Sequence, residues 1–226
     1  MRKNTRTGAR IALVLLLIGL FAGLRAAPAQ ADAPERIIII NTSGNTLTLY
    51  ENGQPAKKYI IASGRHSSPT PTGIYKITSK ARNWGSGFGS RFMRLNVPWG
   101  LYGIHGTNRP GLIGSDVSAG CIRMRNADVE DLYDRVKVGT PVIIEASPFG
   151  FLDSWLTRLS PGDRCAAVME VQKRLNNLGY DTGTPDGIFG ERTKAALLRF
   201  KRDRGLAYTH YVDQATYRAL GIMLFE

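Results

Sequence analysis

The chain has few of the side chains on which metal sites and disulfide frameworks depend. Its 226 residues include two cysteines, Cys121 and Cys165, and three histidines. His66 and His210 have no aspartate, glutamate or cysteine at ligand spacing, so the sequence predicts no metal and no cofactor. Oxidising compartments favour disulfides, but a bond between these two cysteines is not expected, because it would join two apparently separate domains.

The chain also lacks an apolar run long enough to cross a membrane. Its longest run, Ile11 to Leu24, has fourteen residues, whereas a spanning helix needs about 20. Basic residues precede this run, and Ala29-Gln30-Ala31 follows it. A basic start, a short apolar middle and a small-x-small exit predict a signal peptide over residues 1–31. Arg25, between the run and the exit, leaves an uncleaved anchor open, and membrane contact is expected through this segment alone.

Acidic residues are scarce, with 18 of them against 30 basic ones. Residues 1–31 hold five of the basic side chains and none of the acidic ones, so the remaining chain keeps a basic excess. Such a surface suits a polyanionic partner. Nucleic acid is the usual candidate, but no recognisable DNA-binding motif occurs, so the sequence predicts no nucleic-acid partner.

Composition divides the remaining chain into two domains. Residues 35–146 contain short runs of Ile, Val, Thr and Tyr between Ser-Gly-Asn, Asn-Gly and Pro-Thr-Gly turns. This pattern predicts a mainly β domain, a β-sandwich, with one supporting helix that Asn126 caps and Gly139 ends. A linker is expected over residues 147–158. Residues 159–222 show helical spacing and predict a small all-α domain of three helices.

Apolar residues define the expected core of the helical domain. Val168, Val171, Leu175 and Leu178 recur at helical spacing, and Gly179 closes that segment. A second helix is expected over residues 191–204 and a short third one after residue 213. Further core candidates in these two helices are Ala195, Leu198, Phe200, Tyr217 and Leu220.

One segment of the β domain combines a base with a thiol. His105 is followed sixteen residues later by Cys121. A thiol becomes a good nucleophile once it loses its proton, and a neighbouring imidazole can accept that proton. Tyr102 and Ile104 alternate with Gly103 and His105, which predicts a strand with the imidazole on its less apolar face. A turn at residues 108–111 would then return the chain and deliver Cys121 near His105.

Further residues around this pair are candidates for the site. Gly120 lets the backbone turn tightly, and the N–H groups of Gly120 and Cys121 are a hypothetical pair of oxyanion donors. Glycines and aromatic residues at positions 83–92 predict a lid that excludes water, or a plain hairpin loop with packed aromatics. Trp84, Tyr102 and Ser118 are candidates for contact with substrate.

These motifs resemble the L,D-transpeptidase catalytic domain, the YkuD family. The signature of that family is a His-Gly followed, at a similar spacing, by Ser/Thr-His-Gly-Cys. Ala119 replaces the usual second histidine, which leaves the acyl pocket and its substrate preference open. The resemblance covers about 110 residues and extends through residues 36–40, 47–50, 59–64, 69–75 and 139–144.

The resemblance implies a concrete reaction. Cys121 would attack the carbonyl of the third residue of a peptidoglycan tetrapeptide stem and release D-alanine, leaving a thioester. A side-chain amine of a neighbouring stem would then form the cross-link. His105 is the implied general base, and the Gly106 carbonyl is implied to orient its ring. Arg123 is the candidate for anchoring an anionic group of the stem, because guanidinium matches carboxylate geometry; a surface or structural ion pair is the alternative.

The helical domain resembles the type 1 peptidoglycan-binding domain, chiefly through Asp186-Gly187-Ile188-Phe189-Gly190 and the helix that begins near Thr193. The resemblance implies glycan strands and stem peptides as partners, in an extracytoplasmic cell wall or periplasm. Cys165 stands where a small residue is usual and is expected to pack. Two alternatives stay open: an L,D-carboxypeptidase that passes the acyl group to water, and a wall-binding protein without catalysis.

Overall fold

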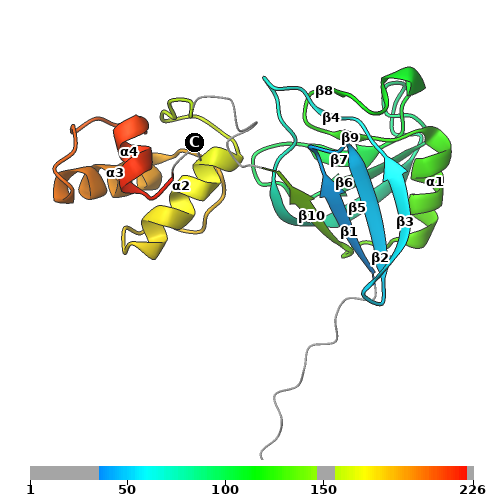
Figure 1. Ribbon diagram of the computed structural model, residues 1–226, viewed down its shortest axis with the longest axis horizontal. Coiled ribbons are helices and arrows are strands. Elements are labelled where there is room, and N and C mark those ends of the chain that lie inside the picture. Colours follow the sequence, from blue (N-terminus) through cyan, green and yellow to red (C-terminus); the bar gives the residue numbers. More distant parts are fainter. Residues whose placement is uncertain (1–35, 147–155, 223–226) are drawn as a thin grey trace, which may run out of the picture. The chain divides into compact units, whose positions relative to one another are not determined.

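The computed structural model describes residues 36–146 and 156–222 (Figure 1). The predicted signal peptide and most of the predicted linker lie outside the described residues. Residues 36–145 contain ten strands, one short 3₁₀-helix (Pro110–Leu112) and one α-helix, and three α-helices follow within residues 166–219. The chain thus has the predicted mainly β domain and the predicted three-helix domain. Within these described ranges, no helix is both long and apolar enough to cross a bilayer.

Eight strands of the β domain form one sheet in the order β3-β2-β1-β10-β5-β6-β7-β9, and β4 pairs with β8. The strands are β1 (Arg36–Asn41), β2 (Thr46–Glu51), β3 (Gln54–Ile60), β4 (Ser63–Gly64), β5 (Gly73–Arg82), β6 (Arg91–Leu95), β7 (Tyr102–His105), β8 (Asp116–Ser118), β9 (Ile122–Arg123) and β10 (Pro141–Glu145). The long strand β5 links the two halves of the sheet, because its first residues pair with β10 and its last with β6.

Alternating apolar residues and tight turns explain the β domain. Ile38 and Ile40 in β1 are fully buried, and so are Leu47 and Leu49 in β2. Every second side chain of a strand points to the same face, so these strands cover a common core. Asn52 joins β2 to β3 with a positive φ of 52°, as a two-residue Asn-Gly hairpin turn requires.

Helix α1 (Asn126–Arg135) supports the sheet as predicted, but both of its ends differ from the prediction. Val136, rather than Gly139, follows its last residue as the C-cap. The capping position at its start belongs to Arg125, and no side chain caps the helix. Asn126 is therefore the first helical residue rather than the cap. Val129 and Leu132 face the core, and α1 packs next to β6 and β7. Asp131 fastens the helix to β3, since its carboxylate accepts a hydrogen bond from the Tyr59 hydroxyl at 2.6 Å.

The helical domain consists of α2 (Ala166–Asn177), α3 (Glu191–Asp203) and α4 (Gln214–Ala219), shown in yellow to red in Figure 1. Val168, Val171 and Leu175 are buried as predicted. Leu178 is 43% exposed because it lies at the C-cap, beyond the last turn of α2. In α3, Phe200 is buried as predicted, but Ala195 is exposed and Leu198 is only half-buried. The buried positions are Thr193, Ala196, Leu197, Phe200 and Lys201.

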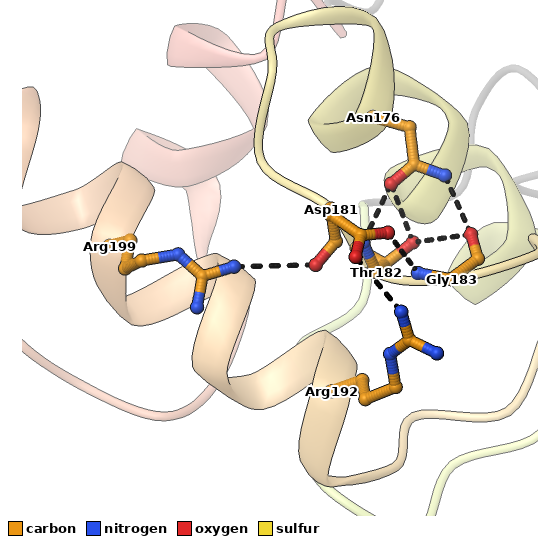
Figure 2. A network of polar contacts seen from close by, with 6 residues as sticks. All are labelled: Asn176, Asp181, Thr182, Gly183, Arg192 and Arg199. Carbon is orange, nitrogen blue, oxygen red and sulfur yellow. Dashed lines mark hydrogen bonds and ion pairs between the residues drawn. The ribbon is translucent and has the colours of Figure 1, made fainter.

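Polar contacts shape the loop after α2 (Figure 2). The Asn176 amide oxygen accepts the Thr182 N–H at 2.7 Å, and its amide nitrogen donates to the Gly183 carbonyl at 2.8 Å. Asp181 pairs with Arg192 at 2.9 Å on the surface. Surface ion pairs contribute little, so the Asn176 amide is the main constraint on this loop.

Candidate active site

Strand pairing brings the predicted base and nucleophile to one face of the sheet. Strands β7 and β9 run parallel, with Ile104 opposite Ile122 and His105 opposite Arg123. One residue back in this register, Cys121 lies next to Gly103. Neighbouring strands share their pleat, so Cys121 and His105 project from the same face as diagonal neighbours. The predicted strand at residues 102–105 is confirmed.

The His105 imidazole is buried, with 3% of the residue exposed. Its Nδ1 lies 2.5 Å from the Gly106 carbonyl oxygen. The Phe88 ring meets the imidazole edge-on at 4.9 Å between centroids, and Phe92 stacks on it at 6.0 Å. Burial lowers the pKa of His105 to about 4, and hydrogen bonding to the Gly106 and Phe88 backbone opposes this only in part. The ring is therefore neutral near pH 7 and retains a lone pair that can accept a proton.

The Cys121 thiol is also protonated at rest. Burial raises its pKa, while the Gly103 backbone and the Arg123 charge act in the opposite direction. The Cys121 Sγ lies 3.9 Å from the Leu101 carbonyl oxygen, and no hydrogen bond joins it to the imidazole within the part of the chain described here. Both partners are thus neutral in this conformation, so no thiolate–imidazolium ion pair is preformed. Cys121 and Cys165 are both free thiols.

The Ser118 side chain stabilises the turn at residues 118–121, which leads to Cys121 and is called the nucleophile turn below. The Ser118 hydroxyl donates to the Cys121 carbonyl at 2.6 Å and accepts the Gly120 N–H at 3.0 Å. Ser118 is fully buried, so the structure does not support its predicted contact with substrate. The Gly120 N–H is already engaged in this conformation, which differs from the oxyanion hypothesis and leaves the Cys121 N–H as the candidate donor.

Gly120 is required in this turn for two reasons. Its φ of +109° is unfavourable for residues with a side chain. A Cβ there would also lie 2.7 Å from the Tyr102 ring. Tyr102 thus packs beneath the nucleophile turn and is half-buried. Ala119, in the position of the usual second histidine, is exposed, and its carbonyl accepts a hydrogen bond from Ser68 Oγ at 3.0 Å.

Arg123 lies directly opposite His105 in the pairing of β7 with β9. Its positive charge lowers the pKa of both His105 and Cys121. Its Nε is buried and makes no hydrogen bond to any residue in the described ranges. A buried guanidinium nitrogen without a partner is costly, so a carboxylate from a ligand would be a favourable partner. No group of three or more metal-binding side chains occurs among the described residues.

The segment at residues 83–90 is the loop of the β5–β6 hairpin. It closes with the Asn83 N–H donating to the Ser90 carbonyl at 3.2 Å. Trp84 stacks on Phe92 at 5.1 Å between centroids and is 50% exposed. Phe88, from the same loop, touches the imidazole. The predicted aromatic cover therefore lies over the base, with Trp84 open to a ligand.

Sequence reasoning missed the part that Asn126 plays near the base. Its amide oxygen accepts the backbone N–H groups of Ser90 and Thr107, each at 3.2 Å. Thr107 follows directly after the Gly106 carbonyl that contacts His105. An asparagine at the start of a helix suggests a cap, and only the fold shows that its amide contacts other loops.

Two family models match the chain. Residues 35–144 match the L,D-transpeptidase catalytic domain, YkuD. Residues 165–220 match the model described as "Putative peptidoglycan binding domain". The first match covers β7 with His105 and the turn before β9 with Cys121, and the second covers all three helices of the helical domain.

Proteins named as L,D-transpeptidases are similar to about half of this chain. "Putative L,D-transpeptidase YkuD" of Bacillus subtilis is 45% identical over 107 residues, which cover 47% of this chain and 64% of that protein. "Putative L,D-transpeptidase YqjB" of the same species is 34% identical over 122 residues, which cover 47% of this chain and 69% of that protein. A solved L,D-transpeptidase from Mycobacterium tuberculosis is 26% identical with a TM-score of 0.45, covering 50% of this chain and 59% of that chain. The chain thus spans less than two thirds of the first relative. It belongs to the L,D-transpeptidase family of the YkuD type, with a type 1 peptidoglycan-binding domain after the catalytic domain.

Proposed function

We propose that this chain is an exported, cysteine-dependent L,D-transpeptidase that cross-links peptidoglycan stems. The observation that carries the proposal is the register of β7 and β9, which supports a shared face for Cys121 and His105. The domains are proposed as residues 1–31 for the signal peptide, 35–146 for catalysis, 147–158 for the linker and 159–222 for wall binding.

In the proposed acylation step, His105 removes the proton of the Cys121 thiol as the sulfur attacks the carbonyl of the third stem residue. A C–S bond forms, and the carbonyl oxygen becomes an oxyanion within reach of the Cys121 N–H. The tetrahedral intermediate then collapses and breaks the C–N bond to D-alanine. The imidazolium returns its proton to the departing amine, which leaves a thioester and a neutral His105.

The transfer step runs through the same groups in reverse order. The side-chain amine of a neighbouring stem attacks the thioester, and His105 accepts the proton that this amine loses. The C–S bond breaks, a new amide forms, and the imidazolium reprotonates the Cys121 sulfur. Since both groups start and end neutral, the resting state with a neutral thiol and a neutral imidazole suits this cycle.

Binding of substrate is assigned to residues around the pair. The partnerless Nε of Arg123 supports a carboxylate of the stem as its ligand. The exposed face of Trp84 supports apolar contact with the stem. The loop at residues 83–90, called the aromatic loop below, would reduce the access of water to the thioester. The basic excess and the second domain support binding to the polyanionic wall outside the membrane.

Incubation of the mature chain with disaccharide-tetrapeptide, followed by mass spectrometry, tests this proposal. We expect a cross-linked dimer with loss of one D-alanine. A shortened monomer would instead indicate hydrolysis, and unchanged substrate together with retention on sacculi would indicate binding without catalysis.

The first testable variant is Cys121→Ala, which removes the nucleophile. We expect it to abolish dimer formation, while binding to sacculi stays within error of the parent. Cys165→Ala is the matched control, because it removes the other free thiol and is expected to leave turnover unchanged. Dimer made by Cys121→Ala would refute the assignment of the nucleophile.

A further inference from the structure

We propose that Asn126 is a positioning residue for the general base, acting through the backbone turn that follows His105. This inference rests on the proposed function for its catalytic meaning. The side-chain hydrogen bonds of Asn126 go to neither the His105 imidazole nor the Cys121 thiol. Its amide oxygen instead ties together the two backbone segments that contact the imidazole.

The amide oxygen bridges two loops that are distant in sequence. It accepts the Thr107 N–H, one residue beyond the Gly106 carbonyl, and the Ser90 N–H, at the end of the aromatic loop. Both distances are 3.2 Å. Gly106 contacts the Nδ1 atom of His105, and Phe88 of the aromatic loop packs against its ring. One side-chain atom therefore restrains both backbone segments next to the base.

Two glycines leave the space that this amide occupies. A Cβ at Gly106 or at Gly89 would lie 2.2 Å from the Asn126 Oδ1. No side-chain carbon approaches an oxygen so closely, so both positions must lack a side chain while the amide keeps its place. Gly106 needs no positive φ. The next atoms that its Cβ would meet, Ser90 N at 3.1 Å and Val129 Cγ1 at 3.2 Å, lie farther away, so the amide is the nearest obstacle to a side chain there.

The amide itself stands on a rigid support. Asn126 is the first residue of α1, and Val129 and Leu132 bury one face of that helix in the core. Asp131 fastens the helix to β3 through Lys57 at 2.8 Å and Tyr59 at 2.6 Å. A group on such a helix can hold a neighbouring turn within the narrow tolerance that catalysis requires.

The chemical consequence concerns the tautomer of His105. A fixed Gly106 carbonyl accepts a proton on Nδ1 and so leaves the lone pair on Nε2. The Nε2 lone pair is then the base available to the thiol. If Asn126 no longer held the turn, the carbonyl would move, and the imidazole would distribute between its two tautomers and orientations.

The test uses the mature full chain, three variants to be compared with it, and a fourth that only assigns the imidazole signals. Asn126→Ala removes the acceptor, whereas Asn126→Asp keeps an oxygen in the same place. Asn41→Ala is the matched control, because the Asn41 Oδ1 also accepts one backbone N–H, from Gly44 at 2.8 Å, but in the turn after β1. The readouts are kcat/KM for dimer formation and the ¹⁵N shifts of the imidazole nitrogens. With three histidines in the chain, His105→Gln assigns the signal.

We expect Asn126→Ala to lower kcat/KM about tenfold or more, since a well-placed general base contributes about 100-fold to 10,000-fold. The Nδ1–H signal of His105 should weaken in the same variant. Asn126→Asp should restore both readouts, and Asn41→Ala should change neither. An unchanged tautomer in Asn126→Ala would overturn the inference, and so would a full loss in Asn126→Asp. If the parent forms no product, the proposed function fails, yet the ¹⁵N shifts still decide the role of Asn126.

Discussion

Asn126 in the β domain and Gln172 in the helical domain both use a side-chain amide to hold a glycine-containing turn. Asn126 accepts two backbone N–H groups around Gly106. The Gln172 amide oxygen accepts the N–H groups of Asp186 and Gly187 at 3.0 and 2.8 Å, and the two N–H donors of its amide nitrogen are shared among three further oxygens. Gln172 is 1% exposed, so it lies within the core of its domain.

The two turns differ in what lies at their end. The turn held by Gln172 leads into α3 and serves the fold of the helical domain. The turn held by Asn126 ends on the carbonyl that contacts His105. Their glycines differ in the same way, because Gly187 has a φ of +72°, whereas Gly106 is restricted by the amide beside it. Similar local chemistry therefore supports folding in one domain and, as proposed here, orientation of a base in the other.

Of the substitutions that test the contrast between the two turns, Gln172→Ala should have the largest effect, and that effect is on stability. The substitution leaves several buried donors and acceptors without partners, and each such group costs about 1–3 kcal/mol. We expect the helical domain to lose about 3 kcal/mol of stability or more. We also expect the variant to lose its retention on sacculi. Turnover of a soluble muropeptide should persist. Denaturant unfolding and a sedimentation assay with sacculi measure the two quantities.

Gln214→Ala provides the control for that variant. The Gln214 side chain donates one hydrogen bond, to the Leu156 carbonyl at 2.9 Å, so its removal should cost about 1 kcal/mol. Equal losses in the two variants would mean that the Gln172 network contributes no more than a single contact, and the contrast between the two domains would then lose its basis.

A smaller effect is expected from Gly106→Ala, which alters turnover more than folding. The new Cβ would displace the Asn126 amide, so kcat/KM should fall about tenfold, as in Asn126→Ala. Gly111→Ala is the control, because a Cβ there meets no atom within 4 Å. The double variant Gly106→Ala/Asn126→Ala should be no worse than either single one, since both remove the same restraint. Additive losses would argue that the two residues act independently.

The strands that carry the site could be predicted from the sequence. Alternation at residues 102–105 predicts β7, and the Asn52 turn predicts the hairpin of β2 and β3, because both depend on local rules of pleat and φ. The mainly β domain and the three helices followed from the same kind of pattern. Leu47 and Leu49 show why, since they alternate with Thr46 and Thr48 in the sequence and are the buried positions of β2. The four consecutive isoleucines at residues 37–40 show no such period, and only the structure tells which of them are buried.

Contacts between distant segments could not be predicted in this way. Asn126 is one residue inside the helix rather than at its cap, and this single step directs its amide to Ser90 and Thr107. Ser118 faces the inside of the nucleophile turn, where the sequence suggested contact with substrate. In α3, Phe200 is buried as predicted, but Ala196 and Leu197 are buried in place of Ala195 and Leu198, because apolar residues at 195–198 fit more than one phase of the helix.

The smallest expected effect concerns the pH dependence of turnover. It sharpens the comparison of the two turns, because the turn held by Asn126 contacts the titratable ring of His105 and the turn held by Gln172 serves the fold. Burial lowers the pKa of His105 to about 4, so the base stays neutral until the pH falls to that region. We expect kcat/KM to decline as pH drops through about 4, well below the ordinary histidine value of about 6.5. Burial also raises the pKa of Cys121, so the alkaline limit should lie above the ordinary thiol range.

Phe88→Ala tests the physical cause of that pH profile. Removing the ring that packs edge-on against His105 admits water, lessens desolvation and should move the acid limit upward, toward about 6.5. Activity is measured from pH 3.5 to 9 alongside circular dichroism, which separates loss of the base from loss of the fold. If the parent already titrates near 6.5, the imidazole is hydrated in the reacting state. The aromatic loop would then lift away from the base before acylation, and the restraint from Asn126 would act through Thr107 rather than through Ser90.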